Sequence, residues 1–213
     1  MAPRGAEGER IKDSEAGTQM KDIRDAFFDE LYEIASKDKD VLFLTADMGA
    51  FGLEKFKRDL PNQFINMGVA EQNTVSVAAG LALGGKKVFI YSIASFISQR
   101  CYEQIKIDLC QMKLPVTIIG SGPGLTYGSD GPTHHAVNDV VIMSVLPDMT
   151  IITAQSPEEA EKAVRMAYES ETPVYIRLAK GKLTATYGKY EDLYSDIQFV
   201  VHSLGYYKRE GET

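Results

Sequence analysis

The stretch "GVAEQNTVSVAAGLALGGKKVFIYSI", residues 68–93, holds two neighbouring elements that decide the fold. Small and apolar residues at 70–83 predict a helix, and the mostly apolar run at 87–93 predicts a buried parallel strand. One carboxylate, Glu71, stands at the start of the helix, and no further charge follows until Lys86. A helix that leads directly into a buried strand favours an α/β fold.

Helical and strand-like patterns alternate along most of the remaining chain. Residues 22–37 carry apolar side chains at spacings of three and four, as an amphipathic helix does. Further strands are expected at residues 41–46, 115–120, 149–154 and 173–179, and further helices at residues 96–112, 136–146 and 156–170. This alternation predicts an α/β fold with a parallel sheet and helices on both faces.

Ligands of such sheets bind at the loops that follow the carboxyl ends of the strands. These loops are expected at residues 47–52, 66–71, 93–98 and 120–135. Glu71 therefore allows two interpretations. An acidic residue in the first helical turn is favoured by the helix dipole by about 0.3–1 kcal/mol, whereas a carboxylate after a buried strand can also point into a cleft.

Composition and charge exclude several classes of protein. Hydrophobic residues make up 44% of the chain, and no apolar run approaches the roughly 18 residues of a membrane span. A net charge of −7 argues against nucleic-acid binding. The only cysteines, Cys101 and Cys110, favour buried free thiols in a reducing cytoplasm over a disulfide framework. We therefore expect a soluble cytoplasmic protein.

The chain divides into three parts by composition. Residues 1–20 are polar and glycine-rich, and we interpret them as a disordered lead. Residues 21–182 form one domain, and residues 183–213 are tyrosine-rich and weakly patterned. We interpret residues 183–213 as a linker followed by the beginning of another structural unit.

The glycine-rich segment 120–139 matches neither of the common phosphate-binding motifs, and a loop of this length is usually functional. It contains Asp130, His134 and His135. Adjacent histidines point apart and no third ligand is evident, so no metal site is expected in this chain. Phe96, after the strand at 87–93, is either a core residue or a platform for a cofactor.

Three stretches in collinear order resemble the pyrimidine-binding domain of transketolase-like, thiamine-diphosphate-dependent enzymes. They are "GVAEQNTVSVAAGLAL" (68–83), "RCYEQIKIDLCQMKLPVTIIGSGPGLTYGSDGPTHHAVNDVVIMSVLPDMTIITAQSPEEA" (100–160) and "PVYIRLAKGK" (173–182). The loop "GSDGPTH" is similar to those of transketolase and deoxyxylulose-phosphate synthase. The pattern is most similar to the C-terminal half of transketolases split over two genes.

The resemblance implies roles for individual residues. Glu71 would hydrogen-bond a ring nitrogen of the cofactor's aminopyrimidine, and Glu71 and His134 would be the catalytic residues. Asp130 and His134 would contact sugar-substrate hydroxyls. Cofactor contacts are implied for Glu71, Ile93, Phe96, Asp47 and Gln99. Ile93 stands where the family has a stacking phenylalanine, Phe96 matches a second pocket aromatic, and Asp47 falls near the thiazolium side.

The family binds the diphosphate and Mg²⁺ through a Gly-Asp-Gly motif on another domain, and this chain has no such motif. The resemblance therefore implies an N-terminal diphosphate-binding partner subunit that carries the Mg²⁺ ligands, in a homodimer or heterotetramer. The tail would begin the family's third domain, so we expect a fragment or a minimal subunit. The implied reaction transfers a two-carbon ketol unit between sugar phosphates. The alternatives are a deoxyxylulose-phosphate-synthase-like carboligase and a non-catalytic interaction module that keeps the fold.

Overall fold

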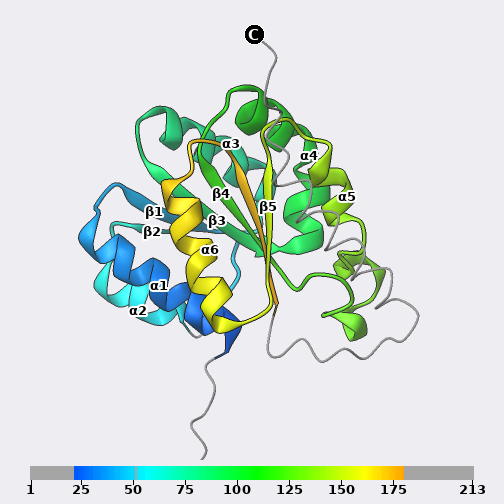
Figure 1. Ribbon diagram of the computed structural model, residues 1–213, viewed down its shortest axis with the longest axis horizontal. Coiled ribbons are helices and arrows are strands. Elements are labelled where there is room, and N and C mark those ends of the chain that lie inside the picture. Colours follow the sequence, from blue (N-terminus) through cyan, green and yellow to red (C-terminus); the bar gives the residue numbers. More distant parts are fainter. Residues whose placement is uncertain (1–21, 51, 180–213) are drawn as a thin grey trace, which may run out of the picture.

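The computed structural model describes residues 22–50 and 52–179, which hold a six-stranded parallel sheet between two layers of helices (Figure 1). The expectations for residues 1–20 and 183–213 lie outside the described residues. The strands are β1 (Val41–Thr45), β2 (Phe64–Asn66), β3 (Lys87–Ile93), β4 (Val116–Ser121), β5 (Thr150–Ala154) and β6 (Val174–Leu178). Their order in the sheet is β2-β1-β3-β4-β6-β5, and every pair is parallel. The predicted α/β class is confirmed.

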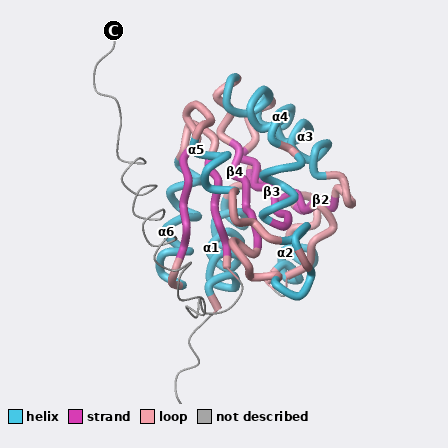
Figure 2. Tube along the Cα trace, turned by 90° about the vertical axis from the view of Figure 1, so that its right-hand side faces the viewer, coloured by secondary structure: helices cyan, strands magenta, loops and turns pink. Residues whose placement is uncertain are grey.

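Helices cover both faces of this sheet, as expected. The α-helices are α1 (Ile23–Lys37), α2 (Leu53–Asp59), α3 (Glu71–Leu83), α4 (Tyr102–Gln104), α5 (Asp139–Ser144) and α6 (Pro157–Glu169). Helices α1 and α6 lie side by side on one face, while α3 and α4 lie on the other (Figure 2). Ser156 caps α6 by accepting a hydrogen bond from the backbone amide of Glu159. Among the described residues, none of the helices is both long and apolar enough to cross a membrane.

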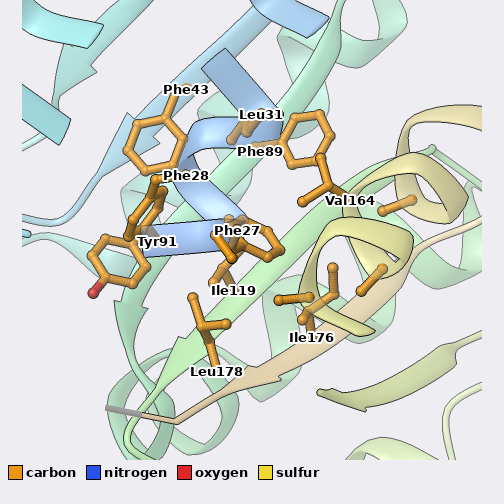
Figure 3. Close-up of a cluster of buried hydrophobic side chains, with 14 of the residues drawn as sticks. Phe27, Phe28, Leu31, Phe43, Phe89, Tyr91, Ile119, Val164, Ile176 and Leu178 are labelled. Atoms are coloured by element: carbon orange, nitrogen blue, oxygen red, sulfur yellow. The ribbon is translucent and has the colours of Figure 1, made fainter. Parts of the chain in front are cut away.

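The period-two alternation of strand side chains produces two separate cores. On β3, Phe89 and Tyr91 face α1 and α6, whereas Val88 and Ile90 face α3. In the first core, the Phe28 ring packs edge-on against Tyr91, with ring centroids 5.2 Å apart (Figure 3). The second core contains Cys101 and Cys110, which are free and buried as expected.

The segment predicted as one helix at 96–112 is helical but wider than an α-helix. It consists of two π-helical stretches, η1 (Phe96–Arg100) and η2 (Ile105–Gln111), joined by the short α4. Its expected apolar face is fully buried: Ile97, Cys101, Ile105 and Leu109. In the first stretch the Ser98 hydroxyl donates to the carbonyl of Ala94 at 2.6 Å, a local side-chain bond of the kind that distorts helices. Sequence periodicity identified the buried face but not the wider turns.

A buried ion pair ties α5 to the sheet. Asp139, the first residue of α5, accepts hydrogen bonds from Arg177 Nε at 2.8 Å and from the Tyr175 hydroxyl at 2.9 Å. The Asp139 and Arg177 side chains are 0% and 1% exposed. Gly120 on the neighbouring strand leaves room for Tyr175, because a Cβ there would lie 2.6 Å from the tyrosine oxygen. The ion pair between Asp139 and Arg177 therefore fixes the point at which the loop before α5 ends.

Asp139→Asn is expected to lower the free energy of unfolding by about 3–5 kcal/mol, because it removes the negative charge facing a buried guanidinium. Urea unfolding followed by circular dichroism measures this change. Glu54→Gln is the control, since Glu54 and Lys57 form an exposed pair that contributes at most about 1 kcal/mol. Equal losses in both variants would contradict the prediction.

Candidate active site

Glu71 lies where the loop after β2 turns into α3, and its side chain is buried rather than directed into solvent. Only 3% of the residue is exposed. Its Oε2 atom accepts a hydrogen bond from Arg100 Nη1 at 2.7 Å, and its Oε1 atom accepts one from the Ser92 hydroxyl at 3.4 Å. The carboxylate therefore faces the end of β3 and the π-helical stretch η1 that follows it.

Arg100 connects Glu71 to the Phe96 ring and, through it, to further aromatic side chains. Its guanidinium carbon lies 4.3 Å from the centroid of the Phe96 ring, which is the geometry of a cation–π contact. The Phe96 ring in turn lies 4.9 Å from the His134 ring, and Tyr127 lies beyond at 6.2 Å from His134. Glu71, Arg100, Phe96 and His134 thus form one continuous group of contacts, which we call the ring cluster.

The loop between β4 and α5 presents His134 to this cluster. It contains two short 3-10 turns, Gly128–Asp130 and Pro132–His134. Thr133 Oγ1 lies 3.0 Å from His134 Nδ1, so the threonine contacts the imidazole. Three further hydrogen bonds hold the loop: Ser95 Oγ to Thr133 O at 2.9 Å, Gln99 Nε2 to Asn138 Oδ1 at 2.8 Å, and His135 Nε2 with Gly128 O at 3.3 Å. Gln99 therefore anchors the loop from η1.

Three other predicted site residues lie at the same edge of the sheet but outside the ring cluster. Asp47, in a left-handed backbone conformation after β1, accepts a hydrogen bond from Asn66 Nδ2 at 2.9 Å. Asp130 is exposed on the first 3-10 turn. Ile93 is the last residue of β3 and lies on the same side of the sheet as Tyr91. Ser92 lies on the opposite side and faces Glu71. The roles of these residues stay predictions.

Sequence reasoning missed Arg100 and Ser92 as neighbours of Glu71. Arg100 lies 29 positions after Glu71, and nothing in the local pattern pairs the two. Ser92 could have been found, because strand alternation places it on the α3 side of β3 together with Ile90. A polar residue on that side at the end of a buried strand indicates a polar site.

The ring cluster fits a flat, hydrogen-bonding heterocycle better than a metal. It offers a buried carboxylate next to an aromatic face that already stacks a planar cation. Within residues 22–50 and 52–179, no three or more His, Cys, Asp or Glu side chains are grouped so that they could hold a metal ion. A buried carboxylate beside an aromatic face has the chemistry that an aminopyrimidine ring, such as that of thiamine diphosphate, would need.

The family described as "Transketolase, pyrimidine binding domain" matches residues 19–186 of this chain. The chain belongs to the transketolase pyrimidine-binding domain family. A solved structure described as "Split gene transketolase, inactive beta4 tetramer" has the same fold, with a TM-score of 0.68 and 32% identity. That likeness covers 78% of this chain and 54% of the other.

Two curated relatives of this transketolase-family chain differ in their reactions. One of them, a subunit of the apulose-4-phosphate transketolase of Phocaeicola vulgatus, is 36% identical over 179 residues, which cover 84% of this chain and 56% of that protein. The 1-deoxy-D-xylulose-5-phosphate synthase of Clostridium perfringens is also 36% identical, over 73% of this chain and 25% of the enzyme. The chain thus spans about half the length of the first relative and a quarter of the second.

Burial, together with the nearby Glu71 carboxylate and against the opposing effect of Arg100, raises the pKa of the Cys101 thiol to about 12. Burial also raises the pKa of Cys110 to about 11. Both thiols are therefore neutral at about pH 8, and we expect iodoacetamide to leave both unmodified in the folded chain. Mass spectrometry after labelling with and without urea measures this. Rapid labelling of Cys101 without urea would contradict the prediction.

Proposed function

We propose that this chain supplies the pyrimidine-binding half of a thiamine-diphosphate-dependent, transketolase-like enzyme. The enzyme would transfer a two-carbon ketol unit from a ketose phosphate to an aldose phosphate. Membership of the transketolase pyrimidine-binding family supports the cofactor class. The observation that carries the proposal is the burial of Glu71 beside a ring platform formed by Phe96.

Glu71 would hold a proton against a ring nitrogen of the aminopyrimidine. The bound cofactor supplies the chemistry that breaks and forms the carbon–carbon bond. A carboxyl group that is 3% exposed makes a stronger hydrogen bond than one in water, because competing water is excluded. Phe96 would cover one face of the ring, and Ser92 would orient the second carboxylate oxygen.

The proposed substrate contacts lie on the loop between β4 and α5. His134 is held between Phe96 and Thr133, so its imidazole borders the ring platform. Asp130 is exposed and free to reach a sugar hydroxyl outside the cluster. Gln99 would keep the loop in place through Asn138, and Asp47 and Ile93 would contribute at the edge of the cofactor site.

A partner subunit would complete the site. We propose an N-terminal transketolase subunit that brings the diphosphate and Mg²⁺ ligands, in a homodimer or a heterotetramer. Several valines next to the site are exposed: Val69 by 75%, Val137 by 51%, Val141 by 56% and Val145 by 70%. The last three recur every four residues through α5 and its two ends, and exposed apolar surface of this kind is typical of protein interfaces.

Glu71→Gln is expected to reduce turnover of the reconstituted complex about 100-fold or more, since it removes the group that holds the proton. The assay measures ketol transfer with saturating thiamine diphosphate and Mg²⁺. Glu33→Gln is the control, because the Glu33 side chain forms an exposed pair with Lys37. Unchanged turnover in Glu71→Gln would favour the alternative of a non-catalytic interaction module.

The second candidate is a deoxyxylulose-phosphate-synthase-like carboligase, favoured by the 36% identity to such a synthase. The two candidates differ in their donor. A transketolase-type complex is expected to consume ketose phosphates without releasing carbon dioxide, because its donor is not decarboxylated. Measuring carbon dioxide from labelled pyruvate checks this. Release that depends on Glu71 would assign the carboligase reaction instead.

A further inference from the structure

Arg100 makes the two contacts that an aminopyrimidine ring would need in the ring cluster. Its Nη1 atom donates to the buried Oε2 of Glu71 at 2.7 Å. The same guanidinium lies over Phe96, with its carbon within 4.3 Å of the ring centroid. One planar group of this chain therefore uses both the carboxylate and the aromatic face.

A guanidinium and an aminopyrimidine resemble each other chemically at their hydrogen-bonding edges. Both are planar, both carry an N–C–N unit, and both stack on aromatic rings. The guanidinium donates an N–H to Glu71, whereas the ring nitrogen would meet Glu71 through the proton that lies between them. Glu71 is 3% exposed, so its carboxylate offers little room for two such groups at once. The two groups would therefore exclude each other at Oε2 and on Phe96.

We propose that Arg100 is an internal competitor for the ring site, displaced from Glu71 and Phe96 when the aminopyrimidine binds. The inference rests on the proposed function, because it assumes that Glu71 receives such a ring. Arg100 thereby sets the affinity of the chain for the ring, and Glu71 keeps a counter-charge when no ring is bound. Cofactor binding is then an exchange of one planar partner for another, in which the charged guanidinium leaves into solvent and one proton is taken up from solvent between Glu71 and the ring nitrogen.

The position of Arg100 allows this exchange. Its side chain is 44% exposed, although its partner Glu71 is buried, so the guanidinium can leave into solvent without crossing the core. It is the last residue of η1, and π-helical turns of this kind often mark functional sites. Its long, flexible side chain can keep the charge hydrated after it has left Glu71.

The test measures binding of a dimethylated aminopyrimidine, the isolated ring portion of thiamine, to the full chain by NMR titration. Arg100→Ala is expected to bind it about tenfold more tightly than the wild type, which corresponds to about 1.4 kcal/mol. Arg165→Ala is the matched control, because Arg165 Nη1 also donates to a glutamate, Glu30, at 2.7 Å and is 48% exposed. The affinity of Arg165→Ala for the aminopyrimidine should equal that of the wild type.

Added guanidinium chloride, far below denaturing concentrations, provides a second readout. It should weaken ring binding in Arg100→Ala by refilling the place of the lost side chain, with a much smaller effect in the wild type. A structural role of Arg100 alone would produce neither the gain in affinity nor this competition. Arg100→Gln, which keeps a longer side chain, should show the same direction of change.

The outcomes separate the inference from the proposed function. Equal or weaker ring binding in both Arg100 variants, or failure of guanidinium to compete, overturns the inference. Glu71→Gln turnover in the reconstituted complex tests the proposed function independently. Loss of turnover in that variant together with unchanged affinity in Arg100→Ala would keep the function and reject the competitor.

Discussion

The burial of one carboxylate organises the site. A charged group removed from water must be paired or hydrogen-bonded, and Glu71 meets this requirement with Arg100 and Ser92. Those two bonds bring together the start of α3, the end of β3 and the π-helical stretch η1. Because Arg100 also stacks on Phe96, the same requirement places an aromatic ring beside the carboxylate. The chemistry proposed for the chain follows from this juxtaposition.

The parallel sheet supplies the framework on which these contacts are possible. Strand alternation sends Tyr91 into one core and leaves Ser92 facing α3, so a one-residue shift of β3 would move the serine away from Glu71. The buried pair of Asp139 and Arg177 then fixes the start of α5 and with it the end of the His134 loop. Both sides of the ring cluster are therefore positioned by buried, sequence-encoded contacts.

The local sequence pattern predicted most of the strands and helices of this framework, but little of the side-chain pairing between them. The strands at 87–93 and 41–46 were recognisable because continuous apolar runs of that length are buried on both faces. Helix α2 was not predicted, and the wide turns of η1 depend on contacts that periodicity does not record. The pairing of Glu71 with Arg100 was likewise hidden, because it joins residues far apart in sequence.

The acid–arginine pairs at Asp139 and at Glu71 differ in exposure, and this difference bears on what each pair can do. Asp139 and Arg177 are both fully buried, so neither can change partner without unfolding part of the core. In the other pair the glutamate is buried but the arginine is 44% exposed. A pair of this kind can open at a lower cost than the pair at Asp139, since the arginine would regain water while a ligand took over the carboxylate. The pair at Glu71 is therefore suited to exchange, and the pair at Asp139 to anchoring.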